Sequence, residues 1–168
     1  MAEIVTGHLQ GHALYDRICT FICAQGFYRA DTVAFFAERN ACFAAALDGE
    51  VVVGTSLNFS AEHSPYLKDT IGGFLADRGL LLGQCVTPAC IYLDPAYRNQ
   101  GLGDRMSVAK SKHSIEDGYT YTVLWGYETQ AIFDYSTRIG HLIDTGTDDM
   151  NGFRIYLRKL EDVISTLS

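Results

Sequence analysis

The chain has 168 residues, a length typical of one domain, and 48% of them are hydrophobic, which is enough for one sizeable core. Its formal net charge of −7 argues against a general affinity for nucleic acid or anionic membranes, and weakly favours cationic small molecules or basic protein segments as partners. We find no signal sequence and no apolar run long enough to span a bilayer, so we expect a cytoplasmic protein with one domain over residues 1–168.

The cysteines indicate a reduced protein rather than a disulfide framework, because their number is odd. Neither the pair Cys19 and Cys23 nor the pair Cys85 and Cys90 has Cys-x-x-Cys spacing or a nearby pair of histidines. Burial in the core is therefore favoured over metal binding for these side chains, and we predict no metal site.

The first half of the chain is predicted to form a strand, two helices and a hairpin. Helical spacing of apolar residues supports the helices, with Asp31 as N-cap of the second and Phe35 and Phe36 facing inward. Asp48-Gly49-Glu50 is a hairpin signal between two β-rich runs. The expected elements are a strand at 3–6, helices at 10–25 and 32–39, and strands at 42–47 and 51–59.

The second half is predicted to alternate strands and helices after an insertion at 62–83 that contains a short helix ending near Gly79. Pro88 cannot donate a hydrogen bond in a sheet, so it marks a bulge, a bend or the true start of the central strand. The expected elements are strands at 84–93, 119–128, 141–144 and 153–160, and helices at 101–117 and 130–139.

A glycine loop joins the central strand to the next helix, with the sequence Arg98-Asn99-Gln100-Gly101-Leu102-Gly103. Glycines at a helix start let backbone N–H groups converge on an anion, although a tight turn with close packing has the same spacing. Met106 stands where a dinucleotide fingerprint needs its third glycine or alanine, and no Gly-Lys-Ser/Thr follows as in a P-loop.

The loop resembles motif A of the GCN5-related N-acetyltransferase (GNAT) superfamily, Arg/Gln-x-x-Gly-x-Gly/Ala, and it is preceded by the Asp-Pro-x-Tyr-Arg lead-in common in that family. The order of predicted elements also resembles the GNAT order, with one extra helix between the third and fourth strands. The resemblance implies an α/β (α+β) fold with a mixed, mostly antiparallel sheet of six to seven strands and about four helices.

The resemblance also implies acetyl-CoA (coenzyme A) as cosubstrate. Its pantetheine arm would run beside Ile91, Tyr92 and Leu93, and the Leu93 N–H would polarise the thioester carbonyl. Arg98, Arg105, Lys110 and Lys112 offer positive charge, although for Lys110 and Lys112 an ordinary solvated helix face is the favoured interpretation. The pyrophosphate would be held by backbone donors of Arg98, Asn99, Gln100, Gly101, Leu102, Gly103 and Asp104.

The proton-handling residues are less well defined by the resemblance. The family usually has a tyrosine acid after the fifth strand; with Gly140 as reference, Ser136 takes its position and Tyr135 lies one residue early, so either could protonate the thiolate. For the general base we consider Glu128, Glu62, His63 and Asp94. An acyl intermediate on Cys85 or Cys90 is a further alternative, although neither has an adjacent base.

These features predict an acetyl-CoA-dependent N-acetyltransferase in which a primary amine attacks the thioester directly. The acceptor would be a small-molecule amine or a basic peptide. Two alternatives stay open: a non-catalytic acyl-CoA-binding sensor or partner module of the same fold, and a transferase that uses a longer acyl-CoA. Homodimers are frequent in the family, and the chain is expected to bind neither nucleic acid nor membrane.

Overall fold

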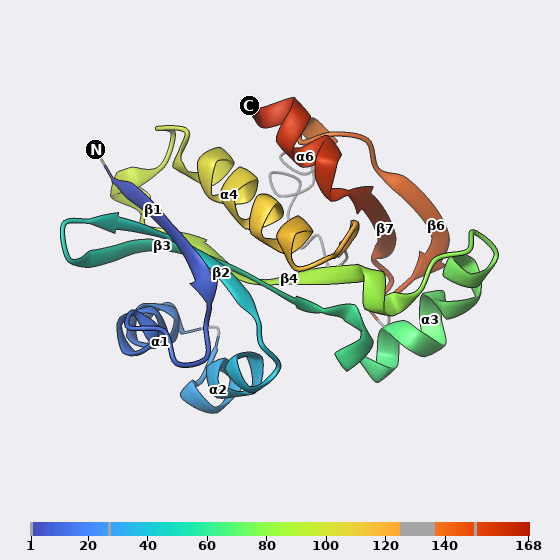
Figure 1. Cartoon of the computed structure of the whole chain (residues 1–168), viewed down its shortest axis with the longest axis horizontal. Coiled ribbons are helices and arrows are strands. Elements are labelled where there is room, and N and C mark those ends of the chain that lie inside the picture. Colours follow the sequence, from blue (N-terminus) through green and yellow to red (C-terminus); the bar gives the residue numbers. More distant parts are fainter. Residues whose placement is uncertain (1, 27, 125–136, 150) are drawn as a thin grey trace. The chain divides into compact units, whose positions relative to one another are not determined.

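A computed structural model describes residues 2–26, 28–124, 137–149 and 151–168 (Figure 1). Its strands form one sheet in the order β1-β2-β3-β4-β5-β7-β6. The strands are β1 (Glu3–His8), β2 (Cys42–Asp48), β3 (Val51–Ser60), β4 (Cys85–Leu93), β5 (Tyr121–Leu124), β6 (Ile143–Asp148) and β7 (Arg154–Lys159). The α-helices are α1 (Tyr15–Ala24), α2 (Ala30–Glu38), α3 (Pro65–Ala76), α4 (Leu102–Glu116) and α6 (Leu160–Leu167), with 3₁₀ turns at Ala61–His63, Leu82–Gln84 and Pro95–Tyr97.

The strand pairs are mostly antiparallel. The pairs β1–β2, β2–β3, β5–β7 and β6–β7 are antiparallel, whereas β4 and β5 run parallel through Cys85–Tyr121 and Val86–Thr122. The expected mixed sheet of six to seven strands is therefore confirmed. No helix within the described ranges is both long and apolar enough to cross a membrane.

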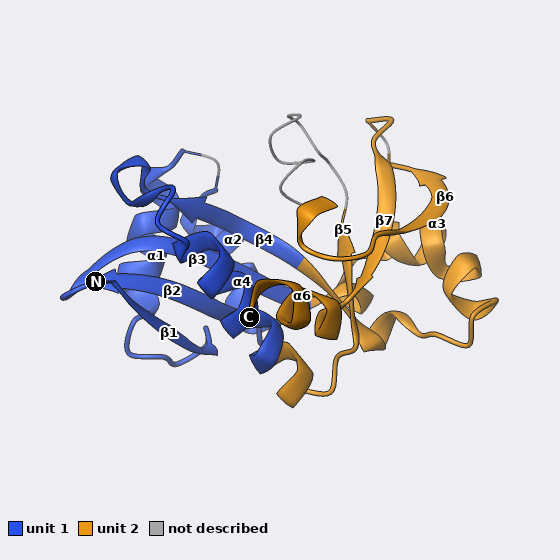
Figure 2. Ribbon diagram, turned by 90° about the horizontal axis from the view of Figure 1, so that it is seen from above, with its two compact units in different colours: residues 1–59, 88–113 blue, residues 60–87, 114–168 orange. Residues whose placement is uncertain are grey.

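The chain divides into two compact units (Figure 2). The first comprises residues 1–59 and 88–113, and the second comprises residues 60–87 and 114–168. That residues 1–168 fold as one domain stays a prediction.

In the first unit, β2 is buried on both faces because alternate side chains point to opposite sides of a strand. Phe43 and Ala45 belong to the core that also contains residues of α1 and α2, whereas Ala44 and Ala46 belong to the core beneath α4 (Figure 1). The sheet of this unit therefore carries α1 and α2 on one face and α4 on the other.

In the second unit, α3 supplies Leu67, Ile71 and Leu75 to a core shared with Val123 of β5 and Leu157 of β7. This helix confirms the one predicted within the insertion at 62–83.

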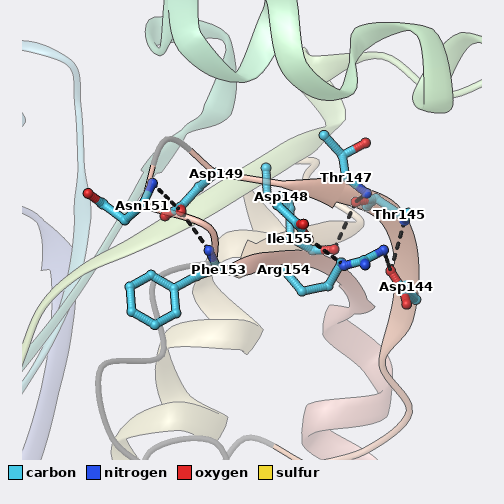
Figure 3. A network of polar contacts seen from close by, with 10 residues as sticks. Asp144, Thr145, Thr147, Asp148, Asp149, Asn151, Phe153, Arg154 and Ile155 are labelled. Carbon is cyan, nitrogen blue, oxygen red and sulfur yellow. Dashed lines mark hydrogen bonds and ion pairs between the residues drawn. The ribbon is translucent and has the colours of Figure 1, made fainter.

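The β6–β7 hairpin of the same unit is held by polar contacts (Figure 3). Arg154 Nε lies 2.6 Å from Asp148 Oδ1, and Arg154 Nη1 donates to Asp144 Oδ1 at 3.3 Å. Asp149 Oδ1 accepts from the backbone N–H groups of Asn151 and Phe153, which fixes the turn between β6 and β7.

Two expectations about local structure were wrong, and one helix was missed. The N-cap of α2 is Arg29 rather than Asp31, which lies in the first turn. Phe36 is buried, but Phe35 is 38% exposed, and the Arg39 guanidinium lies 3.5 Å from its ring centre. Helix α6 was not predicted, although Leu160 and Val163 are buried at helical spacing.

Candidate functional site

The central strand β4 is irregular two residues after Pro88. Cys90 has φ +50°, in the left-handed region that few residues other than glycine adopt, and Thr55 Oγ1 donates a 3.0 Å hydrogen bond to its carbonyl oxygen. After this residue Ile91 is 65% exposed, which is high for a large apolar side chain in a central strand. The strand therefore breaks its pattern at the start of the stretch along which the resemblance places the pantetheine arm.

The Leu93 N–H points away from β3. The next N–H along the chain, that of Asp94, donates to the Val53 carbonyl of β3 at 2.8 Å. Because successive N–H groups of an extended strand point to opposite edges, the Leu93 N–H is directed to the other edge of β4. This is the orientation that an oxyanion donor at Leu93 requires.

Arg98 lies against the same end of β4. Its Nε donates to the Leu93 carbonyl at 3.0 Å, and its guanidinium carbon lies 5.7 Å from the centre of the Tyr92 ring. Tyr92 in turn meets Phe21 of α1 edge-to-face, with ring centres 5.8 Å apart. Arg98 thus holds an exposed cation beside the last residues of the strand.

The segment between β4 and α4 is fixed by side-chain hydrogen bonds. Asp94 Oδ1 accepts from the Ala96 N–H at 2.9 Å, and Gln100 Nε2 donates to the Ala96 carbonyl at 3.1 Å. Tyr97 OH donates to Asp48 Oδ2 at 2.6 Å, and this hydrogen bond raises the pKa of the Tyr97 phenol. The loop is thereby attached to the turn between β2 and β3.

The glycine loop gives α4 an open N-terminus. Asn99 and Gly101 have φ values of +60° and +73°, and the Gly101 carbonyl accepts from the Arg105 N–H at 3.1 Å. Since this is the first hydrogen bond of the helix, the N–H groups of Leu102 and Gly103 lie in its first turn, where the helix dipole favours an anion. No heavy atom lies within 4 Å of the position that a Cβ at Gly101 would occupy. The loop can accept a phosphate group at that place.

Gly54 of β3 lets β4 and α4 approach closely. A Cβ at this position would lie 2.7 Å from Leu93 Cδ1 and 3.1 Å from Met106 Sδ. Because Gly54 has no side chain, Leu93 at the end of β4 and Met106 of α4 can both pack against the backbone of β3 at this position.

Lys110 is buried, which overturns the favoured interpretation of this side chain as part of a solvated helix face. It is 7% exposed, and its Nζ donates to Ser56 Oγ at 2.5 Å and to the Leu57 carbonyl at 3.5 Å. Burial lowers the pKa of Lys110 to about 8. It therefore lies in the core beneath α4 and supplies no charge to the surface, whereas Lys112 is exposed as expected.

The cysteines are free thiols within the described ranges. Cys85 and Cys90 are buried as predicted, whereas Cys19 and Cys23, for which burial was also predicted, are only half-buried. Burial raises the pKa of Cys85 to about 11 and that of Cys90 to about 12. Because the thiolate is the nucleophile, these values disfavour an acyl-cysteine intermediate at neutral pH.

The candidate general bases that the structure describes belong to different units. Asp94 lies in the first unit, at the start of the cofactor loop. Glu62 and His63 are exposed in the second unit, where the Glu62 carboxylate lies 2.9 Å from the Cβ position of Gly83. The remaining predicted catalytic residues, Glu128, Tyr135 and Ser136, lie outside the described residues.

Sequence reasoning missed the contacts that hold the loop in place. Tyr97 was noted only as part of the lead-in, and Thr55 and Gly54 were not singled out. A glycine inside a strand of β-branched residues was the available signal at Gly54, since it indicates close approach of another segment. The Tyr97–Asp48 hydrogen bond spans 49 positions and has no local signature.

The sequence matches no protein-family model and no curated protein. Solved structures do resemble this chain. A GNAT-family acetyltransferase from Staphylococcus aureus Mu50 is 15% identical, covers 94% of this chain and 99% of its own, and has a TM-score of 0.60. An N-acyl amino acid synthase from uncultured soil microbes is 16% identical, with 99% and 96% covered and a TM-score of 0.61.

A third similar structure is the PaiA N-acetyltransferase from Thermoplasma acidophilum in complex with coenzyme A, at 13% identity, 94% and 99% coverage and a TM-score of 0.54. At these identities the similarity establishes the fold, and it extends over nearly the whole chain. The resemblance to the GNAT superfamily is thus confirmed for the architecture, and the chain has the acyl-CoA N-acyltransferase (GNAT) fold.

Proposed function

We propose that this protein is an acetyl-CoA-dependent N-acetyltransferase that moves the acetyl group from the thioester to a primary amine. The observation that carries the proposal is the continuous set of groups along β4 and α4. An exposed Ile91 and an outward Leu93 N–H are followed by Arg98, whose Nε donates to the Leu93 carbonyl. An open helix N-terminus at Gly101 completes the set. Together these groups suit a pantetheine arm, a thioester carbonyl and a pyrophosphate.

In the proposed reaction the amine nitrogen attacks the thioester carbon, and the carbonyl oxygen becomes an oxyanion. This oxyanion accepts a hydrogen bond from the Leu93 N–H. Collapse breaks the carbon–sulfur bond, leaving an amide and the CoA thiolate. A base takes one proton from the amine nitrogen, and an acid gives one proton to the thiolate. We propose Tyr135 or Ser136 as the acid; Asp94, Glu62, His63 and Glu128 stay candidates for the base.

The high pKa values of Cys85 and Cys90 support direct attack rather than transfer through cysteine. We also propose that the acceptor is a small-molecule amine or a basic peptide, in keeping with the net charge of −7, and that the protein acts in the cytoplasm. The chemistry as written needs no metal ion.

Titration calorimetry with acetyl-CoA and with CoA tests the cofactor site, and both should bind. Absence of binding would overturn every acyl-CoA function for this chain. A thiol-release assay with polyamines, amino acids, aminoglycosides and basic peptides then tests catalysis, using acetyl-CoA beside a longer acyl-CoA. Turnover that is fastest with acetyl-CoA supports the proposal. Faster turnover with the longer chain would favour the other transferase, and binding without turnover would favour a sensor.

A further inference from the structure

Two histidines from distant parts of the sequence meet in the first unit. His8 is the last residue of β1, and His113 lies in the last turn of α4. Their ring centres are 4.9 Å apart at an interplanar angle of 61°, and each offers a ligand nitrogen within 4.8 Å of the other's. Both side chains are half-buried. Two half-buried imidazoles at this separation can both contact one small ligand that lies between them.

The backbone around Asn40 orients His8. Asn40 has φ +53°, and its N–H donates to the Ala37 carbonyl, while the Leu9 N–H donates to the Ala41 carbonyl at 2.8 Å. This geometry brings the Asn40 carbonyl oxygen to 3.4 Å from His8 Nδ1. Since a carbonyl can only accept, the contact favours a proton on Nδ1 and leaves Nε2 as the atom with a lone pair. Metal-bound histidines are commonly fixed in this way, with one ring nitrogen donating to a backbone carbonyl.

We propose that His8 and His113 bind a divalent transition-metal ion, with zinc as the expected ion. Imidazole nitrogen is a ligand that zinc prefers, and water can occupy the coordination positions that the two histidines leave. Donor atoms of a tetrahedral zinc site lie about 3–3.5 Å apart, so small side-chain rotations suffice to form it.

The proposed metal is distant from the proposed acyl transfer. His113 lies eleven residues after Leu102, which corresponds to about 16 Å along the axis of α4. The ion would therefore join the end of β1 to the last turn of α4 and stabilise the first unit, without contacting the cofactor loop. Loss of the metal site and loss of the cofactor site are consequently separable in experiments.

The test uses the full chain without a polyhistidine tag, stripped of metal with a chelator that is then removed. Calorimetry with ZnCl₂ should give one ion per chain. Zinc at about one hundred times its dissociation constant should raise the melting temperature by about 5–10 °C. Co²⁺ should bind without a thiolate-to-metal charge-transfer band, which excludes the five cysteines as ligands. Absence of binding, or a thiolate band, would overturn the proposal.

The matched variants are His8→Gln and His113→Gln, against His63→Ala and His141→Ala at exposed positions of the second unit. The first two should lose at least about tenfold in zinc affinity while keeping CoA binding, which reports on their folding. The two control variants should not change zinc binding. Unchanged affinity in His8→Gln or His113→Gln would contradict the assignment.

Lys110 provides a further variant, because it lies three residues before His113 and its charge opposes a cation. Removing that charge in Lys110→Met should preserve or strengthen zinc binding. A weaker site in this variant would also contradict the assignment.

Discussion

Within the first unit, the two halves of α4 face the same sheet, but the buried side chains of one half are apolar and those of the other half are polar. In the first half, Leu102 and Met106 are buried in an apolar cluster with Ala44, Ala46 and Val53. In the second half, the residues that continue this row are Lys110 and His113, which meet Ser56 and His8. The apolar half fixes the helix start, so that its backbone donors can be placed without any special side chain. The polar half carries a buried and a half-buried ionisable side chain, which need specific partners.

If the first half acts only through its backbone, a large side chain at Gly101 should have the greatest effect on binding. Gly101→Trp is expected to weaken CoA binding by at least about 100-fold, because the indole would occupy the space in front of the helix N-terminus. Calorimetry with CoA measures this. The left-handed backbone at Gly101 adds a cost of about 1–2 kcal/mol to folding.

Gly118 provides the matched control for this effect. It follows the other end of α4, has φ +91°, and also has no heavy atom within 4 Å of its Cβ position. Gly118→Trp should therefore lower stability by a similar amount and leave CoA binding unchanged. Equal loss of CoA binding in both variants would mean that backbone strain, rather than a phosphate cradle, explains the result.

The same contrast explains what sequence could predict. The glycine loop is a local feature, since two glycines, a preceding apolar strand and a following helix are all contiguous, and the structure has the predicted strand and helix on either side of it. Lys110 belongs to the buried row because it follows Met106 by four residues, but a lysine at that spacing more often belongs to a solvated face. Its burial depends on Ser56, 54 positions away, which no local pattern reveals.

The second prediction concerns the polar half and has a defined pH dependence. The pKa of Lys110 is about 8 in the folded chain, whereas an unfolded lysine titrates near 10.4. At pH values between about 8 and 10.4 the unfolded chain binds more protons than the folded chain. The free energy of unfolding of the wild type therefore increases as the pH rises through this range. Below pH 8 the penalty for burying the Lys110 ammonium is fully present. Denaturant unfolding at pH 7 and pH 10 measures this effect. The stability of Lys110→Met relative to wild type should be about 2–3 kcal/mol lower at pH 10 than at pH 7.

Lys112→Met is the control, because Lys112 is exposed on the same helix. Its stability relative to wild type should not change between the two pH values. A pH-independent difference for Lys110→Met as well would show that the Lys110 ammonium is as well solvated in the folded chain as in the unfolded one.

The third prediction tests the tight approach that supports the apolar half. Gly54→Val should destabilise the protein by about 1–3 kcal/mol, because the new atoms would overlap Leu93 and Met106. Gly73→Ala in α3 should instead stabilise it by about 0.5–1 kcal/mol, since nothing lies within 4 Å of that Cβ position and alanine favours a helix. Thermal and denaturant unfolding measure both. The same sign for the two variants would contradict the packing described here.

The rest of the candidate site could not be predicted because it depends on long-range or irregular geometry. The position of the break in β4 is an example: Pro88 suggested it, but the left-handed residue is Cys90, held by a hydrogen bond from Thr55 on the neighbouring strand. The His8–His113 contact joins the two ends of the first unit's sequence, and neither histidine lies in a recognisable ligand motif. Pairing of strands and helices decides such contacts.

The smallest expected effect concerns the tether between the cofactor loop and the β2–β3 turn. Tyr97→Phe removes the hydrogen bond to Asp48 but keeps the ring, so the loop before Gly101 should become less well fixed while its backbone donors stay in place. CoA affinity is expected to fall by about two- to fivefold, far less than in Gly101→Trp. Asp48→Asn keeps an acceptor for the phenol and should retain most of the affinity. If Tyr97→Phe and Asp48→Asn both bind CoA as wild type does, the apolar contacts beneath α4 suffice to hold the loop. A loss as large as that of Gly101→Trp would instead place the Tyr97 hydroxyl itself among the groups that bind the cofactor.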